Sequence, residues 1–137
     1  MSRPVVALTS QFAKQVNAYI VGPTSVVVKP NELASALDRP RNTAYYQPGL
    51  PQAYYAATLA YGVIMGHPFM DGNKRTAFWI ASEYLRETGA APLTPPGMSV
   101  ADSVSMDAIG DAHSRVAQGQ MDVEGLFQVY SACQNAR

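Results

Sequence analysis

The stretch from Ala53 to Gly66 is apolar on nearly every face. A helix with no polar face has to be buried, so this stretch predicts a helix through the middle of the domain. The helical period resumes at Asn73, and Gly89 is placed to end this second helix. Its apolar positions are Ala77, Ile80, Ala81, Tyr84 and Leu85. Residues 67–72 are therefore expected to form a loop between two core helices.

Two more helices are predicted before this pair. Ser10 can cap the first, which ends near Gly22-Pro23. Its apolar face comprises Phe12, Val16 and Ile20. Asn31 can cap the second, which runs to about Asp38 before Pro40 stops it.

Two segments in this part of the chain have less regular patterns. Residues 25–29 are mostly β-branched and predict either a strand or a loop. Residues 41–52 combine Tyr45 and Tyr46 with a Pro-Gly turn signal, which predicts a small hairpin or an irregular flap. The two tyrosines either pack, or lie on a flap that positions a target peptide by strand addition.

The carboxy-terminal part predicts two further helices. Ser99 begins a capping-box pattern for the first, which Gly119 ends, and the second follows Asp122. Their apolar positions are Val104, Ala108, Ala112 and Val116, then Val123, Leu126, Phe127, Tyr130 and Cys133. His113 is expected on an exposed face, whereas Trp79 and the tyrosines of the central helix are expected in the core. The whole predicts one all-α domain over residues 1–137, with about six helices and room for a short hairpin flap.

The charge composition limits the binding partners. Ten basic residues balance ten acidic ones, which argues against a broad electrostatic grip on nucleic acid or on an anionic membrane. Polar or charged residues interrupt every apolar run, so no membrane span of ~20 residues is expected. Cys133 is the only cysteine and cannot form an intramolecular disulfide. We expect a cytoplasmic protein that binds any phosphate locally.

The segment from His67 to Thr76 reads His-Pro-Phe-Met-Asp-Gly-Asn-Lys-Arg-Thr. It ends at the start of a predicted helix, where unpaired main-chain N–H groups and the helix dipole favour an anion. Each residue of the run 72–75 has a use in phosphate binding: Gly72 for close approach of the backbone, Asn73 for an amide donor, and Lys74 and Arg75 for charge. Two adjacent cations at a helix N-terminus oppose the dipole, which suggests that an anionic ligand offsets the cost.

Two other residues of this segment complete a candidate active site. Asp71 would repel phosphate unless a cation lay between them, and Mg²⁺ bound to a di- or triphosphate meets that need. His67 can accept a proton near neutral pH, so it is the candidate base toward an attacking hydroxyl. Phe69 is expected to be a buried anchor for the loop. A zinc site from His67, Asp71 and His113 is an alternative, but it leaves residues 72–75 without a role.

The segment resembles the signature of the Fic/Doc (Fido) superfamily, His-Pro-Phe-x-Asp/Glu-Gly-Asn followed by Gly-Arg or Lys-Arg. Residues 32–40 and 61–66 are also similar to segments that precede the motif in Doc-like members. The resemblance implies a small all-α core with His67 as general base, Asp71 as the Mg²⁺ ligand, and the phosphates held by Gly72, Asn73, Lys74 and Arg75. It also implies ATP as the donor substrate.

Two positions separate the branches of this superfamily. Members that transfer AMP typically have glycine where this chain has Lys74, and a second arginine where it has Phe78. The Lys-Arg-Thr pattern resembles the Doc (death-on-curing) branch, which implies transfer of the γ-phosphoryl group of ATP to a hydroxyl of a translation factor such as elongation factor Tu, as a toxin. AMP transfer to a protein hydroxyl and a degenerate nucleotide-binding module are the alternatives.

Some Fic proteins inhibit themselves through a helix with a Ser/Thr-x-x-x-Glu-Gly/Asn pattern. The nearest segment here, residues 120–125, lacks the hydroxyl residue and is expected to be the ordinary start of the last helix. Control by a separate antitoxin chain is therefore the natural hypothesis for this protein.

Overall fold

The computed structural model describes residues 8–91, 93 and 100–135, without the side chains of residues 100–105. This part of the chain is all-helical: α1 (Ser10–Val21), a short 3₁₀ turn η1 (Gly22–Thr24), α2 (Pro30–Tyr46), α3 (Gln52–Gly66), α4 (Asn73–Glu87), α5 (Val100–Ala117) and α6 (Val123–Asn135). The predicted class and the number of helices are confirmed. Ser99, the expected capping residue of α5, and the side chain of Val104 lie outside the described part.

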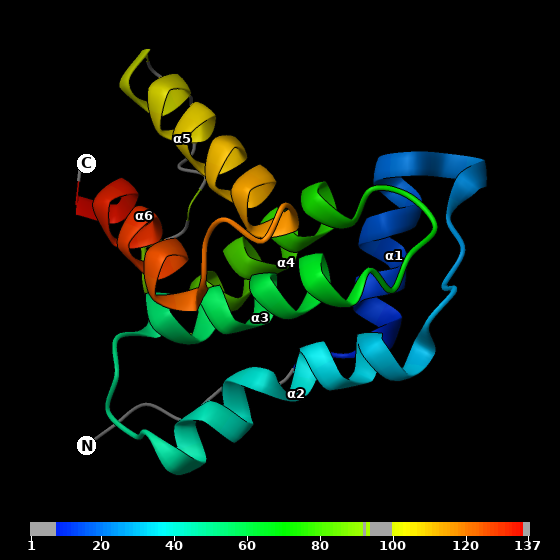
Figure 1. Ribbon diagram of the computed structural model, residues 1–137, viewed down its shortest axis with the longest axis horizontal. Helices are drawn as coiled ribbons and strands as arrows, with labels where there is room; N and C mark the ends of the chain where they lie inside the picture. The colour runs from blue at the N-terminus through cyan, green and yellow to red at the C-terminus, as the bar shows by residue number, and fades with distance from the viewer. Residues whose placement is uncertain (1–7, 92, 94–99, 136–137) are drawn as a thin grey trace.

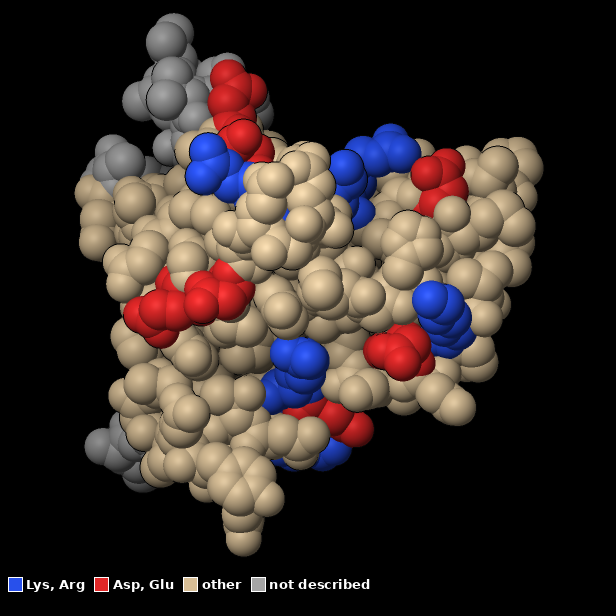
Figure 2. Space-filling view, in the orientation of Figure 1, with Lys and Arg blue, Asp and Glu red and all other residues tan. Residues whose placement is uncertain are grey.

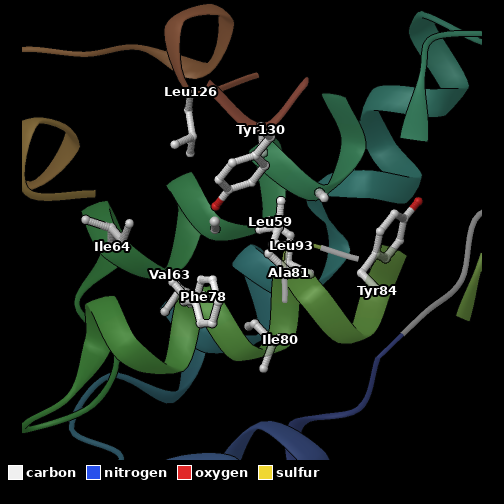
Figure 3. Close-up of a cluster of buried hydrophobic side chains, with 14 of the residues drawn as sticks. Leu59, Val63, Ile64, Phe78, Ile80, Ala81, Tyr84, Leu93, Leu126 and Tyr130 are labelled. Atoms are coloured by element: carbon white, nitrogen blue, oxygen red, sulfur yellow. The ribbon is translucent and has the colours of Figure 1, made fainter. Parts of the chain in front are cut away.

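Helix α3 is the centre of the fold, as its apolar sequence predicted. It contacts α2, α4, α5 and α6, and Figure 1 shows it running beside α4 with α2 on its other side. Side chains of α3, α4 and α6 converge in the core (Figure 3). The largest of them are fully buried: Leu59, Ile80, Tyr84, Leu85, Leu126 and Tyr130.

Helix α2 is longer than predicted, because Pro40 lies inside it and does not end it. A proline inside a helix costs about 3 kcal/mol. Pro40 is itself buried, and it continues the buried face of Leu33, Ala36 and Leu37. A Cβ on Gly62 of α3 would come within 3.0 Å of Ala36, so the two helices approach closely here. We attribute the persistence of the helix to this packing.

The predicted hairpin or flap at residues 41–52 is therefore wrong. Residues 41–46 are the last turns of α2, and Figure 1 places this end of α2 across the molecule from the loop between α3 and α4. Tyr45 and Tyr46 are each 80% exposed, and their rings contact each other edge to face. They lie far from the candidate site.

Several helix ends differ from prediction by one or two residues. Thr9, not Ser10, caps α1 by accepting a hydrogen bond from the N–H of Phe12. Helix α2 starts at Pro30, with Lys29 as its N-cap in place of Asn31, because proline suits the first position of a helix. By contrast, α6 begins directly after Asp122 as predicted, and Asp122 accepts a hydrogen bond from the N–H of Gly125 there.

Other helix ends lie where the sequence predicted them. Gly89 and Gly119 have φ of 79° and 74° just after α4 and α5, as expected for glycines that terminate helices. Residues 120–125 form the turn into α6 and its first residues, so the ordinary helix start predicted there is confirmed.

Two side chains lie opposite to their predicted environments. His113 is 2% exposed, because α6 folds back against α5 and the hydroxyl of Tyr130 lies 2.6 Å from its Nε2. Trp79 is 49% exposed, because its neighbours Phe78 and Ile80 are on the buried side of α4 and Trp79 is not. Of the tyrosines of α3, Tyr55 is buried, whereas Tyr54 and Tyr61 are partly buried.

Charges of both signs are spread over the face drawn in Figure 2, and no single-sign patch dominates it. No helix in the described residues is both long enough and apolar enough to cross a membrane.

Candidate functional site

The loop between α3 and α4 is held by unusual backbone conformations at both ends. His67 caps α3 with φ 49° and ψ 54°, and within the described residues it is the only residue other than glycine with positive φ. A side chain is uncommon in this left-handed region and marks a constrained turn. Gly72 has φ 76° and is the N-cap of α4. The loop that joins α3 to α4 thus begins and ends with a residue in the left-handed region.

The six predicted site residues meet at one cavity. His67, Asp71, Gly72, Asn73, Lys74 and Arg75 all line a hollow of about 530 Å³, here called the motif cavity. His67, Asp71, Lys74 and Arg75 are exposed to it. Its volume is within the range of about 300 to 1,000 Å³ that is usual for small-ligand sites.

The floor of the motif cavity is the N-terminus of α4. The first hydrogen bond of this helix runs from the N–H of Thr76 to the carbonyl of Gly72, 2.8 Å, so the N–H groups of residues 73–75 have no acceptor within the helix. No side chain caps this end. Among the ion pairs of the described residues, none includes Lys74 or Arg75. Two cations and three N–H donors therefore face the same hollow.

Asn73 has a different role from the predicted one. Its side chain is 5% exposed, and it forms two hydrogen bonds with Phe69: Nδ2 donates to the carbonyl (2.8 Å) and Oδ1 accepts from the N–H (3.0 Å). This pair closes the loop on itself and holds Phe69, which is fully buried as expected. The group of Asn73 that can face an anion is its main-chain N–H.

Gly72 is required for a reason that the sequence does not reveal. A Cβ at this position would lie 2.5 Å from Cγ1 of Val21 and 3.3 Å from Nδ2 of Asn17, both on α1. The glycine thus permits the positive φ and the close contact with α1. Gly72 also lines the motif cavity, and its role in the close approach of an anion stays a prediction.

Asn17, which no sequence pattern singled out, anchors the loop from α1. This side chain is fully buried. Its Nδ2 donates to the carbonyl of Asp71 (2.8 Å) and to Oγ1 of Thr76 (3.1 Å), and its Oδ1 accepts from the hydroxyl of Ser25 (2.7 Å). Its position could have indicated this role, because Asn17 lies on the same buried face of α1 as Ala13. A polar side chain on a buried face is expected to have hydrogen-bond partners.

Residues 25–29, predicted to be a strand or a loop, are a loop that flanks the motif loop and has one β-bridge to it. Val27 forms an isolated antiparallel bridge with Phe69. The N–H of Val28 donates to the carbonyl of Pro68, and the N–H of Met70 donates to the carbonyl of Val26, both at 2.8 Å. The segment that lies beside the site as a flap is therefore 25–29.

The carboxylate of Asp71 is positioned by its own loop. Oδ1 accepts a hydrogen bond from the N–H of Gly72 (2.8 Å), and Oδ2 lies 3.5 Å from the hydroxyl of Thr24. Asp71 is exposed and lines the motif cavity. Mg²⁺ is commonly bound by one or two carboxylates together with substrate phosphates and water, and the carboxylate of Asp71 beside the uncapped N-terminus of α4 fits that donor set.

The zinc alternative has no structural support. Among the described residues, no group of three or more His, Cys, Asp or Glu side chains could hold a metal ion. His113 is buried behind Lys74, and burial lowers its pKa to about 4, with the charge of Lys74 acting in the same direction and a hydrogen bond with the Lys74 main chain opposing it.

With this geometry established, comparison with known proteins identifies the family. The sequence model of the Fic/DOC family matches residues 7–85. This chain belongs to the Fic/DOC family. The matched region contains α1 to α3, the motif loop and most of α4. It therefore includes Asn17 and all the residues that line the motif cavity except Ala117. A search of curated proteins found no match. Proteins of the Fic/DOC family are typically transferases that modify other proteins.

Proposed function

We propose that this protein transfers the γ-phosphoryl group of ATP to a serine or threonine hydroxyl of a target protein. The observation that carries the proposal is the shared cavity of His67, Asp71, Lys74 and Arg75 at an uncapped helix N-terminus. A base, a candidate metal ligand and a phosphate-binding floor thus face one space. Phosphoryl transfer depends mainly on such positioning and on charge stabilisation.

In the proposed reaction, the main-chain N–H groups of residues 73–75 and the side chains of Lys74 and Arg75 bind the phosphate oxygens. Asp71 would hold Mg²⁺, which when bound offsets the negative charge of the triphosphate. His67 accepts the proton of the target hydroxyl as its oxygen forms a bond to the γ-phosphorus. The bond between the γ-phosphorus and the bridging oxygen breaks, and ADP leaves with that oxygen.

Two residues favour phosphoryl transfer over AMP transfer. Lys74 occupies the position of the glycine typical of AMP-transferring relatives, and its side chain lines the motif cavity where that glycine would leave room. Phe78 occupies the position of their second arginine, and it is 8% exposed. The surface at this position is therefore apolar and offers no guanidinium to phosphate.

We propose that a peptide segment of the target protein binds along the edge of residues 25–29. In antiparallel pairing the main-chain groups of Val26 and Val28 face the motif loop, so those of Val27 point to the other side. A target peptide can add there as a strand. The side chains of Val26 and Val28 are 43% and 47% exposed and can contact it.

The resemblance to the Doc branch also suggests a target, a cellular role and a means of control for this protein. We propose that the target is a translation factor similar to elongation factor Tu, that the protein acts as a cytoplasmic toxin, and that a separate antitoxin chain controls it. The antitoxin proposal is motivated by residues 120–125, which start α6 and lack the inhibitory pattern. A pull-down from the native host that returned no small partner would count against it.

The decisive experiment uses ATP labelled at the γ or at the α position, with Mg²⁺ and a cell lysate. We expect a protein band labelled only from the γ position, and no band with His67→Ala. Tyr45→Ala, a substitution at an exposed residue far from the cavity, is the matched control and should behave as wild type. Label from the α position would favour AMP transfer, and no label from either would favour a degenerate nucleotide-binding module. Transfer that survives His67→Ala would refute the mechanism.

A further inference from the structure

His113 connects α6 to the N-terminus of α4, although it is not part of the motif loop. It lies on α5, is 2% exposed, and is outside the residues that the family model matches. Together with Lys74 and Arg75 it lines a hollow between α4 and α5. Its ring has two polar contacts, one with the hydroxyl of Tyr130 on α6 and one with the main chain of Lys74. A buried side chain of α5 therefore contacts the helix end that forms the floor of the motif cavity.

The contact with Tyr130 fixes where the imidazole carries its proton. Tyr130 is fully buried, and burial raises the pKa of its phenol well above the usual value, so the hydroxyl keeps its proton. A buried O–H needs an acceptor, and Nε2 of His113 lies 2.6 Å away. Burial lowers the pKa of His113 to about 4, so the ring is neutral at pH 7 and has a single N–H. Because Nε2 accepts, that N–H is on Nδ1.

The main-chain group of Lys74 that contacts the imidazole is its carbonyl. The hydrogen bond with the Lys74 main chain acts to raise the pKa of His113, in opposition to burial. A carbonyl acceptor has this effect because it favours the protonated ring, whereas a main-chain N–H would favour the neutral ring. A carbonyl has two lone pairs, so it can accept from Nδ1–H of His113 as well as from the helical N–H of Phe78.

The carbonyl of Lys74 and the N–H of Arg75 belong to one peptide group. This N–H is among the three at the start of α4 that have no acceptor within the helix. Hydrogen bonds in a chain polarise one another, so a bond to the oxygen of an amide makes its N–H a stronger donor. Tyr130, His113 and this peptide group form such a chain, and its last N–H is at the floor of the motif cavity.

We propose that His113 is a positioning residue for phosphate binding: by donating to the carbonyl of Lys74, it orients and polarises the peptide group whose N–H, from Arg75, binds a phosphate oxygen. The proposal rests on the proposed function, because that function supplies the phosphate. It also assigns a role in the site to α5 and α6, which lie outside residues 7–85.

The tautomer of His113 is the first test, and it requires neither a ligand nor a variant. In protein made with nitrogen-labelled histidine, NMR chemical shifts of the two ring nitrogens distinguish Nδ1–H from Nε2–H. We expect His113 to be the neutral Nδ1–H form at pH 7. The exposed His67 is the internal comparison and should exchange between forms. An Nε2–H form or a doubly protonated ring at His113 would overturn the proposal.

Two substitutions of His113 separate its two contacts. The amide nitrogen of asparagine lies about where Nδ1 lies in histidine, and the amide of glutamine extends to about the position of Nε2. His113→Asn can therefore keep the donor to Lys74, whereas His113→Gln keeps a partner for Tyr130 and loses that donor. We expect His113→Asn to be the less stable of the two, because it leaves the buried hydroxyl of Tyr130 unpaired. If His113 only supported the fold, phosphate binding should follow the same order.

Calorimetry with inorganic tripolyphosphate and Mg²⁺ measures the effect on binding. We expect His113→Gln to bind about threefold more weakly than wild type, since polarisation strengthens a hydrogen bond by on the order of 10 to 30%. His113→Asn should bind as wild type does, although it unfolds at a lower temperature than His113→Gln.

The main-chain amide signals provide a local readout of the same titration. Tripolyphosphate should shift the amide proton of Arg75 in the wild type and in His113→Asn, and should shift it less in His113→Gln. The amide of Asn73, at the same helix end, is the internal control and should shift equally in all three proteins.

The outcomes separate this proposal from the proposed function. If γ-phosphoryl transfer depends on His67 but the two His113 variants bind tripolyphosphate equally, His113 has no role in phosphate binding and the proposed function stands. Weaker binding by His113→Asn than by His113→Gln would also overturn the role of the Nδ1 donor. Failure of the wild type to bind both tripolyphosphate and ATP would overturn both proposals.

Discussion

The side-chain amide of Asn17, on α1, donates a 2.8 Å hydrogen bond to the main-chain carbonyl of Asp71, in the loop before α4. The two residues are 54 positions apart in the sequence. Because Asp71 is the candidate Mg²⁺ ligand, this bond links the first helix to the orientation of the carboxylate in the motif cavity.

Replacing Asn17 with alanine should therefore affect both folding and transfer. The carbonyl of Asp71 and the hydroxyl of Ser25 would each lose a partner, and a buried polar group left unpaired costs about 1 to 3 kcal/mol. We expect urea unfolding to show a loss in that range. Under conditions where the variant is folded, the Mg²⁺ concentration for half-maximal transfer should rise, because Asp71 is less well held. Lys14→Ala, at an exposed site on α1, should change neither quantity.

Gly72→Ala should destabilise the protein more than an ordinary substitution of glycine. The residue has φ 76°, which costs a side chain about 1 kcal/mol, and the new Cβ would lie 2.5 Å from Val21, an overpacking of about 1 to 3 kcal/mol. We expect a total of about 2 to 4 kcal/mol by thermal or urea unfolding.

Two controls separate these causes. Adding Val21→Ala to the Gly72 variant should recover the packing part and leave the strain. Gly110→Ala has space for its Cβ and lies within a helix, so it should stabilise the protein by about 0.5 to 1 kcal/mol. If Gly72→Ala proved as stable as wild type, the close contact of this loop with α1 would be incorrect.

The stability of the protein should decrease below neutral pH because of His113. Burial lowers the pKa of His113 to about 4 from an unfolded value of 6.5. Between these two values the unfolded chain binds more protons than the folded chain, so the free energy of unfolding rises with pH across this window. The contribution is complete above about pH 6.5 and is lost as the pH falls toward 4, with a size on the order of 3 kcal/mol.

Urea unfolding from pH 4.5 to 7.5 tests this dependence. His113→Gln should give a flatter profile, although its stability at neutral pH is lower because the packing and one hydrogen bond change. The chain has only one other histidine, His67, which is exposed; His67→Ala, which keeps His113 and its contact with Tyr130, is the control. A steep profile in His113→Gln would assign the acid sensitivity to other groups.

Asp71→Asn should reduce transfer without unfolding the protein. Asparagine retains an oxygen that can accept the N–H of Gly72, and the side chain is exposed, so we expect a change in stability below about 0.5 kcal/mol. The loss of negative charge should weaken Mg²⁺ binding, raising the Mg²⁺ requirement of transfer at least tenfold. Asp107→Asn, at an exposed position on α5, is the control. Equal Mg²⁺ dependence in wild type and Asp71→Asn would exclude Asp71 as the metal ligand.

Several misplaced predictions share one physical cause. Local patterns predicted that Pro40 would end a helix and that His113 would be exposed. Packing against α3 keeps Pro40 inside α2, and packing against α6 buries His113. The turn signal after Tyr45 and Tyr46 was placed too early, because α2 stays helical up to Tyr46. For Pro40 and His113 the deciding partner lies on another helix, and a local pattern holds no information about it.

The sequence by itself determined the buried central helix, the loop that follows it and the helix after the loop, because periodicity and glycine placement act over a few neighbouring residues. It also brought His67, Asp71, Lys74 and Arg75 together, since all four lie between residues 67 and 75 of the chain. Only the tertiary structure decided that Asn17 holds the carbonyl of Asp71, that residues 25–29 are the flanking segment, and that Gly72 is there for α1. These contacts join segments that are distant in sequence, and they depend on hydrogen bonding and close packing between those segments, which a local pattern does not encode.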